Sequence, residues 1–330
     1  MTLNKIIIKP RLVVYSGITI FLLFIPYILS TFNLILFEYG LALAIVGLGF
    51  NLLLRYTGLL SFGHGAFFAT GAYAVAMMGK YFPSLYSIEI LIPVALIASF
   101  VVSVIFGFIC VRHTKIFFAI LTLSLSMILF ALLFKLYNIT GGSDGLYIPV
   151  PKIFGITFKR RPDLLSGAYY YFLLAIFFIS FVIMKGIVNS PFGKALQAIR
   201  DNEVRAELIG IRVKRYKLFA FIISGLFTGT GGALWAFVNG RVTPEVSHWF
   251  FSGEIVYMTL LGGFLNFEGP IIGAMVFTFL KLYAMGFTEY WMFIIGITLI
   301  LLVLLLPTGI SGGLERLITM VKNRKVLDGM

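Results

Sequence analysis

Few residues of this chain have the type and spacing that catalysis requires. The stretch GISGG at 309–313 matches the G-x-S-x-G pattern, in which a sharp turn exposes a nucleophilic serine. It follows a long apolar segment with no histidine nearby in the sequence, so a chance match in a glycine-rich chain is favoured over a hydrolase. The sequence contains no G-x-x-x-x-G-K-S/T phosphate loop, so the chain is not expected to hydrolyse ATP by that route. We therefore expect a protein that is not an enzyme and has no metal site and no cofactor.

One histidine lies within an apolar segment, in the stretch SFGHGAFF. A carrier driven by protons or sodium usually needs a relay of acidic or histidine side chains inside the membrane, and His64 alone does not make a relay. His64 is expected to be a hydrogen-bonded structural residue, with a contact to a transported substrate as the alternative. Cys110, the single cysteine, lies in an apolar run and is expected to serve packing.

Glycines are concentrated in two apolar segments, at 58–71 and 262–273. Glycine weakens a helix by about 1 kcal/mol relative to alanine, so such clustering needs a reason. Two reasons remain open, which are close helix packing through small residues and an unwound segment that lines a cavity. Paired broken segments in the two halves of a chain are typical of a transport path. The residues expected to line or bend such a path are Gly58, Ser61, Gly63, His64, Gly65, Gly71, Gly262, Gly263, Gly269 and Pro270.

Membrane helices must position these residues. The chain is 60% hydrophobic and 12% charged, whereas a soluble domain is near 25% charged. We expect an all-α polytopic membrane helical bundle that forms a single transmembrane domain over residues 1–330. It should contain about ten membrane segments, two or three of them short or broken, because about 20 residues of helix cross a bilayer. The expected segments are 12–29 (a span rather than a cleaved signal peptide), 34–54, 58–78, 88–111, 116–137, 169–188, 218–238, 254–265, 271–285 and 291–306.

The basic residues predict the orientation of the bundle. With the N-terminus in the cytoplasm, eighteen of the 26 Lys and Arg residues fall on the cytoplasmic side and six on the outer side. This excess follows the positive-inside rule and explains the net charge of +13 without a nucleic-acid partner. Both termini are then cytoplasmic, and residues 138–167 form an external loop.

A polar stretch at 189–217, here called the coupling interval, is expected to lie in the cytoplasm. Ser190-Pro191 is a favourable helix start, and apolar residues follow at roughly helical spacing among charges of both signs. A short amphipathic helix beside a membrane could fit a protein partner. An ordinary basic loop that only fixes the topology is the alternative.

Several long stretches, in chain order, carry a resemblance to one known family. They are GLGFNLLLRYTGLLSFGHGAFFATGAYA at 47–74, FFAILTLSLSMIL at 117–129, TGGSDGL at 140–146, SPFGKALQAIRDNEVRAELIGIRVKRYKLFAFIISGLFTGTGGAL at 190–234, LLGGFLNFEGPIIGA at 260–274 and LLLPTGISGGL at 304–314. With these stretches the chain resembles the permease subunits of bacterial branched-chain amino acid ABC importers, of the longer, LivM type. The resemblance implies a subunit of a bacterial or archaeal cytoplasmic membrane that works with a second permease, two cytoplasmic ATPase subunits and a periplasmic or surface substrate-binding protein.

The resemblance also implies a role for the coupling interval. In such importers a cytoplasmic helix of the permease docks in a cleft of the ATPase, and its position here is 195–210. The importer pattern of Glu-Ala-Ala followed by Gly maps onto 204–206 and 210, where only Ala206 and Gly210 agree. Ala198, Ala206 and Ile209 are expected inside the cleft, with charged residues at its rim. The full set expected in the coupling helix is Ala195, Ala198, Ile199, Arg200, Asp201, Glu203, Arg205, Ala206, Ile209 and Gly210.

A mechanism and two alternatives follow from the resemblance. ATP binding is expected to close the ATPases, move the coupling helix as a rigid body and switch the permease pair between outward and inward openings. The external loop is expected to contact the binding protein, which would set most of the selectivity; a plain connector is the other reading of the loop. The residues expected at that contact are Thr140, Gly141, Gly142 and Asp144. A permease for urea or short amides and an ATP-independent facilitator remain open.

Overall fold

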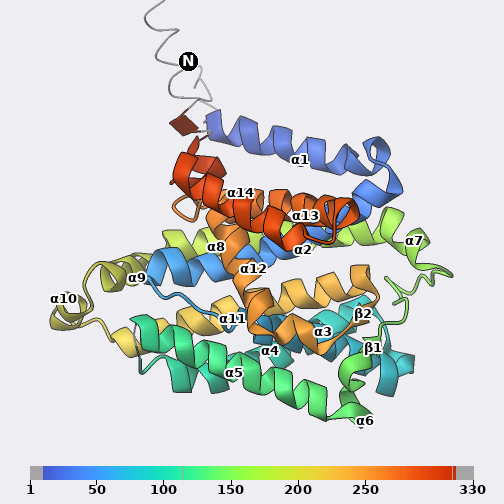
Figure 1. Cartoon of the computed structure of the whole chain (residues 1–330), viewed down its shortest axis with the longest axis horizontal. Coiled ribbons are helices and arrows are strands. Elements are labelled where there is room, and N and C mark those ends of the chain that lie inside the picture. The colour runs from blue at the N-terminus through green and yellow to red at the C-terminus, as the bar shows by residue number, and fades with distance from the viewer. Residues whose placement is uncertain (1–9, 114, 314, 317–330) are drawn as a thin grey trace, which may run out of the picture.

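The computed structural model describes residues 10–113, 115–313 and 315–316, which form a bundle of helices running along the long axis of the molecule (Figure 1). This confirms the predicted all-α class. The long helices are α1 (Pro10–Ile28), α2 (Thr31–Asn51), α3 (His64–Tyr81), α4 (Ile88–Cys110), α5 (Lys115–Lys135), α8 (Tyr170–Asn189), α11 (Val213–Asn239), α12 (Trp249–Gly262), α13 (Gly269–Phe287) and α14 (Trp291–Leu305).

Short elements connect the long helices. The π-helical turn η1 (Leu52–Thr57) continues α2, and the π-helical turn η4 (Leu165–Tyr169) joins α7 (Arg161–Leu164) to α8. The other short helices are α6 (Tyr137–Thr140), α9 (Pro191–Asp201), α10 (Glu203–Leu208) and the 3-10 turns η2 (Pro83–Leu85), η3 (Gly142–Asp144) and η5 (Pro244–Ser247). The strands β1 (Leu146–Tyr147) and β2 (Arg241–Val242) pair antiparallel, with Leu146 opposite Val242.

Six helical stretches among the described residues are long and apolar enough to cross a membrane: Thr31–Thr57, Ile88–Cys110, Ile116–Lys135, Arg161–Asn189, Val213–Asn239 and Gly269–Phe287. Two shorter apolar helices cover Thr19–Ile28 and Trp291–Leu302. These stretches fit a polytopic bundle, and the expected number of about ten membrane segments stays a prediction.

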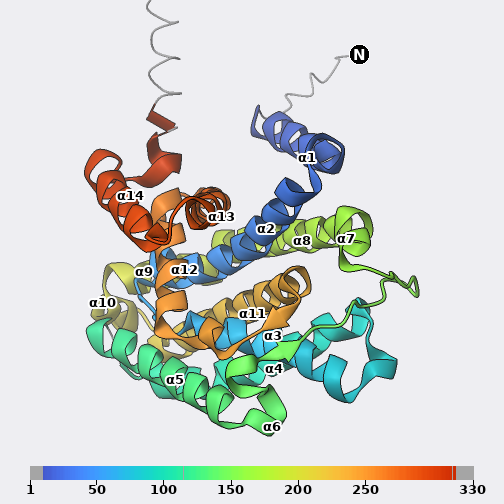
Figure 2. The same cartoon turned by 45° about the vertical axis from the view of Figure 1, so that its right-hand side comes forward.

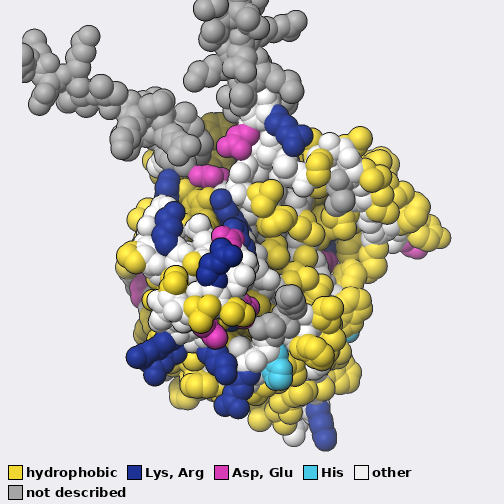
Figure 3. All heavy atoms as spheres, turned by 90° about the vertical axis from the view of Figure 1, so that its left-hand side faces the viewer, with side chains coloured by type: hydrophobic (Ala, Val, Ile, Leu, Met, Phe, Trp, Pro, Cys, Tyr) yellow, Lys and Arg dark blue, Asp and Glu magenta, His cyan; other side chains and the backbone are white. Residues whose placement is uncertain are grey.

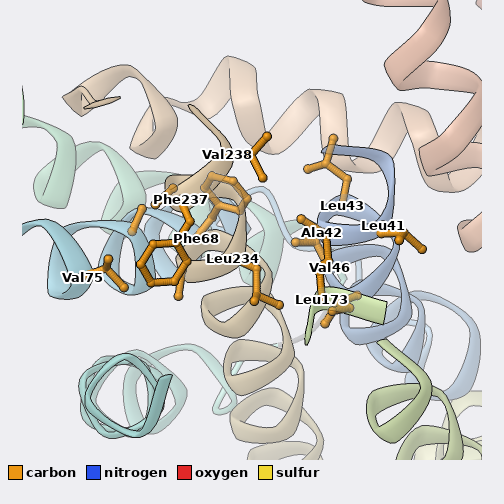
Figure 4. Close-up of a cluster of buried hydrophobic side chains, with 14 of the residues drawn as sticks. Leu41, Ala42, Leu43, Val46, Phe68, Val75, Leu173, Leu234, Phe237 and Val238 are labelled. Atoms are coloured by element: carbon orange, nitrogen blue, oxygen red, sulfur yellow. The ribbon is translucent and has the colours of Figure 1, made fainter. Parts of the chain in front are cut away.

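The centre of the bundle is formed by α2 and α11. In each of them 72% of the apolar window is buried, against 22% in α5, so α5 lies at the periphery. Side chains from α2, α3, α8 and α11 meet in the core, including Val46, Phe68, Leu173 and Leu234 (Figure 4). The packing depends on small residues, because a Cβ at Gly71 of α3 would stand 1.9 Å from the Gly229 carbonyl oxygen of α11.

The two polar regions lie at opposite ends of the bundle. In Figure 1, α9 and α10 lie at one end, whereas α7 and the paired strands lie at the other, and Figure 2 also shows α10 and α7 on opposite sides. This arrangement agrees with a coupling interval and an external loop on different sides of a membrane. Which end faces the cytoplasm stays a prediction.

Candidate functional site

The coupling interval forms two short helices rather than the single helix expected over 195–210. The helix α9 begins after Ser190, whose hydroxyl accepts a hydrogen bond from the Gly193 N–H at 3.4 Å. It ends at Asn202, which has an extended backbone (φ −163°, ψ 107°). The Asn202 side chain then caps α10 by accepting from the Arg205 N–H at 2.9 Å. The break gives α10 its own direction at the end of the molecule.

The apolar side chains of α10 are divided between the bundle and the solvent. Ala206 is buried, with 2% exposed, and packs with the core of this end of the bundle. Val204, Leu208 and Ile209 are 68%, 82% and 71% exposed, and we call these three side chains the α10 tip. A set of exposed apolar side chains at the end of a helix is typical of a surface that a protein partner covers. Ala206 therefore contributes to the attachment of α10, and Ile209 lies on its free face.

The other residues expected in the coupling helix lie on α9, on α10 or in the turn after α10. Ile199 is buried, Ala195 and Ala198 are half-buried, and Asp201 and Arg205 are exposed. Gly210 has a φ of +90° and ends α10 in the left-handed region, where glycine is favoured.

Arg200 connects α9 to the end of the α2–η1 helix. Its Nη1 donates to the Arg55 carbonyl oxygen at 2.8 Å. Its aliphatic chain packs on Gly58, where a Cβ would stand 3.0 Å from the Arg200 Cγ. Gly58 has a φ of +71° and ends η1. The residues after this turn, 58–63, are not helical, and we call them the broken segment.

Lys217 connects α10 to α11. Its ammonium group forms an ion pair with the Glu203 carboxylate, and its side chain is only 1% exposed. The Glu203 side chain is 40% exposed, so one partner is buried and the other reaches solvent. Through Arg200, α9 is attached to η1 and to Gly58 at the start of the broken segment, and through Glu203, α10 is attached to α11.

His64 lies at the meeting point of these two elements. It is fully buried at the start of α3, where its ring packs edge-on against Phe50 at a centroid distance of 4.9 Å. Its Nδ1 lies 3.0 Å from the Ser61 hydroxyl of the broken segment, and its Nε2 lies 2.7 Å from the Ser224 hydroxyl of α11. The hydrogen bonds expected from the sequence are therefore present.

The other hydrogen bonds of Ser224 and Ser61 determine which nitrogen of the His64 ring carries the proton. The Ser224 hydroxyl donates to the Gly49 carbonyl oxygen at 2.6 Å, so it must accept from the Nε2–H of His64. The Ser61 hydroxyl accepts from the Gly63 N–H at 3.2 Å and is free to donate to Nδ1. The imidazole is then neutral, with its proton on Nε2, and each of its nitrogens has one partner. A neutral histidine with both ring nitrogens hydrogen-bonded suits a structural role between α2, α3 and α11.

The glycines of the broken segment and α3 permit close backbone approach. A Cβ at Gly63 would stand 2.5 Å from the Thr122 carbonyl oxygen of α5. A Cβ at Gly65 would stand 2.9 Å from the Ser252 hydroxyl, which itself accepts from the Gly65 N–H. Gly58 and Gly63 thus lie in a non-helical stretch, and Gly65 and Gly71 lie at close contacts of α3, while their part in a transport path stays a prediction.

The second glycine group forms a tight turn between α12 and α13. A Cβ at Gly262 would stand 1.9 Å from the Gly269 carbonyl oxygen, and Pro270 occupies the first turn of α13. Gly263 has a φ of +99° and lies against the segment around Thr308. The Ser311 hydroxyl accepts from the Asn266 amide at 3.2 Å and is buried beside this turn. The G-x-S-x-G serine thus holds two segments together, and its partner is an amide rather than a base.

In the external loop, most of the expected contact residues face inward. The Thr140 side chain is 1% exposed and donates to the Leu136 carbonyl oxygen at 2.8 Å. Gly141 and Gly142 have φ values of +75° and +51° and form the turn after α6. Asp144 is exposed and accepts from the Tyr137 hydroxyl at 2.9 Å, and this hydrogen bond raises the pKa of Tyr137. Asp144 is thus the member of this group that a partner could contact.

Sequence reasoning missed several residues of these sites. Val204 and Leu208 are four residues apart and lie on one helical face, a spacing that could have identified the α10 tip. Ser224 and Lys217 gave no local signal. Their partners, His64 and Glu203, are 160 and 14 residues away in the sequence.

The chain matches, over residues 33–303, the family described as the branched-chain amino acid transport system permease component. Similar proteins include the high-affinity branched-chain amino acid transport system permease protein LivM of Escherichia coli (strain K12), which is 29% identical over 81% of this chain and 67% of its own. LivM of Salmonella typhimurium is 28% identical over 86% of this chain and 71% of its own. The permease protein LivH of Escherichia coli (strain K12) is 23% identical over 83% of this chain and 92% of its own. No solved structure matches the chain.

Proposed function

Since the chain belongs to the permease family of branched-chain amino acid transport systems, we propose that it is the membrane subunit of an ATP-driven importer of leucine-like amino acids. The chain is similar to both LivM and LivH, two permeases of one Escherichia coli strain, which supports pairing with a second permease. Two ATPase subunits on the cytoplasmic side and an external binding protein complete the proposed importer.

The observation that carries the ATP-driven part is the double attachment of the coupling interval. The α10 tip is an exposed apolar surface at one end of the bundle, suited to a cleft of an ATPase. Behind it, Arg200 donates to the Arg55 carbonyl oxygen of η1 and packs on Gly58, the first residue of the broken segment, and the Glu203–Lys217 pair holds α11. A movement of α9 and α10 would therefore be passed to both sides of the His64 network.

An apolar cavity beside the broken segment supports the proposed substrate class. It has a volume of about 500 Å³ and is bounded by the broken segment on one side and α5 on the other. The lining residues are Gly58, Leu60, Phe62, Ile116, Ala119, Ile120 and Leu123. A wall of this composition suits the aliphatic side chain of a leucine-like substrate. Movement of the broken segment would change the shape of this cavity.

The test is to place charge on the α10 tip. The complete transporter carrying Leu208→Glu and Ile209→Glu is reconstituted in proteoliposomes with its binding protein, and uptake of labelled leucine and leucine-stimulated ATPase activity are measured. Both activities are expected to fall more than tenfold, because a buried carboxylate without a partner is costly at a protein interface. The control is Ile156→Glu in the external loop, where the native side chain is 58% exposed.

Two results would contradict the proposal. Unchanged uptake and ATPase activity in the Leu208 and Ile209 variant would show that the α10 tip does not dock an ATPase. Leucine uptake that persists without ATP in the unmodified transporter would identify an ATP-independent facilitator instead.

A further inference from the structure

A pocket of about 230 Å³ lies where α4 ends and α11 begins, at the same end of the bundle as α9 and α10. Its lining is partly apolar and partly basic. Gly107, Phe108, Val111 and Leu218 supply the apolar part, and the exposed residues Arg112, Lys214 and Arg215 supply the basic part, here called the rim. Basic side chains gather on this end of the molecule (Figure 3).

Close helix packing creates the pocket. A Cβ at Gly107 would stand 2.7 Å from the Leu218 Cδ1, so α4 and α11 touch at this level. Beyond Gly107, α4 ends at Cys110, and α11 has only just begun at Val213. The space between the two helix ends is therefore bounded by the side chains that follow Gly107 on α4 and by the first turn of α11.

The three cations at the rim form no ion pair within the part of the chain that the structure describes. All three residues are exposed. The first turn of α11 contains no acidic side chain, and cations at a helix N-terminus are unfavourable. Lys214 and Arg215 lie in this first turn, and Arg112 follows the C-terminal end of α4, so an anion between them would relieve the repulsion of three like charges.

The surface next to the pocket indicates what kind of anion would fit. Phe219 lies four residues after Arg215, one turn along α11, and Phe108 lies in the last turn of α4, just before the turn that carries Arg112. Phe108 and Phe219 are each 57% exposed. A ligand with a charged head at the rim and an apolar tail along these side chains would satisfy both parts of the surface. A soluble anion would leave the apolar part uncovered.

We propose that this basic pocket binds the head of an anionic phospholipid, with the phosphodiester between Arg112, Lys214 and Arg215 and an acyl chain against Phe108 and Phe219. The pocket is expected at the level of the lipid headgroups, because it lies at the ends of two apolar helices that are long enough to cross a membrane. The site goes beyond the proposed transport function and does not depend on it. A lipid held there would also join α4 to the N-terminal end of α11, which begins at Val213, four residues before Lys217.

Native mass spectrometry of the purified transporter tests the proposal directly. Phosphatidylglycerol or phosphatidylcholine is titrated in mild detergent, and the dissociation constant of the first bound lipid is measured. We expect phosphatidylglycerol to bind more tightly, with an affinity that decreases as the salt concentration rises. In the pocket variant, which carries R112Q, K214Q and R215Q, the affinity should fall about 100-fold, since each cation near a lipid surface contributes about a fivefold change.

The control variant removes three basic residues from the external loop, with K152Q, K159Q and R160Q. It has the same net charge as the pocket variant and should retain phosphatidylglycerol. The single variants of the rim should each weaken binding about fivefold, and thermal unfolding of every variant verifies that the bundle is folded.

Three results would overturn the proposal. Equal losses in the pocket and control variants would show that net charge alone attracts the lipid. Displacement of phosphatidylglycerol by glycerol phosphate, or unchanged binding in Phe108→Ser, would identify a soluble-anion site. Bound lipid in the isolated permease, but none in the complete transporter, would show that a partner protein covers the pocket.

Discussion

The Glu203–Lys217 ion pair should respond very differently to the loss of each partner. The Lys217 side chain is 1% exposed, so removing Glu203 leaves an ammonium group buried without a counter-ion. The Glu203 side chain is 40% exposed, so removing Lys217 leaves a carboxylate that water can reach. Glu203→Met is therefore expected to destabilise the protein more than Lys217→Met, although both variants remove the same pair.

The expected magnitudes follow from this difference in burial. Breaking a fully buried pair costs about 3–5 kcal/mol, and partial exposure of Glu203 reduces the expected cost of Glu203→Met to about 2–3 kcal/mol. Lys217→Met should cost about 1 kcal/mol or less, as for a solvated carboxylate that loses an exposed pair. In the Lys217→Met background, adding Glu203→Met should change the free energy of unfolding by less than about 0.5 kcal/mol, because no buried charge remains.

Unfolding in mixtures of SDS and a mild detergent measures the three free energies. Asp201→Met serves as the control, because its pair with Arg200 is exposed, with 67% and 40% of the side chains accessible. It should cost less than about 1 kcal/mol. Equal costs for the two single variants of the buried pair would refute the reasoning, as would a double variant as unstable as Glu203→Met alone.

Four other variants and one control test the remaining contacts by the same unfolding assay and by leucine uptake. His64→Ala removes a ring that bridges two hydroxyls and leaves a cavity, and should cost about 2–4 kcal/mol, whereas Ser224→Ala should cost about 1–2 kcal/mol. Gly71→Ala should cost more than about 2 kcal/mol, because its Cβ would meet the α11 backbone at 1.9 Å. The control, Gly167→Ala, has open space around it and should cost less than about 0.5 kcal/mol. Arg200→Ala should lower stability by about 1 kcal/mol and should lower leucine uptake by more than this loss of folded protein explains. Uptake that falls only in proportion to the amount of folded protein would show that Arg200 has no part in coupling.

The long apolar helices and the two polar ends could be predicted, because they depend on composition summed over many residues. The break at Asn202 was not predicted, since the spacing of Ala195, Ile199 and Ala206 fits one continuous helix. A local signal was present: Asn is a preferred N-cap, and Glu203 follows it in the first turn of α10. The inward direction of Ala206 had no such signal, because spacing defines a helical face but not the surface that it meets.

The partners of His64 show where sequence reasoning ends. Ser61 is three residues away and could have been proposed as a partner from the sequence. Ser224 and Gly49 come from other helices, and only the packing of α11 against α2 brings them together. The same limit applies to Lys217, whose burial is caused by the way α10 folds back on α11.

The two attachments of the coupling interval have a consequence that neither would have alone. A segment fixed only through Arg200 could turn about that contact without moving α11, and one fixed only through Glu203 could turn without moving the broken segment. With both fixed, a displacement of α9 and α10 must shift the broken segment and α11 together or strain the contacts between them. Ser224 lies seven residues after Lys217, two turns along the same face of α11, so such strain would reach the hydrogen bonds of His64. Because a close-packed interior changes between discrete arrangements rather than deforming continuously, this joint is where we expect the bundle to switch.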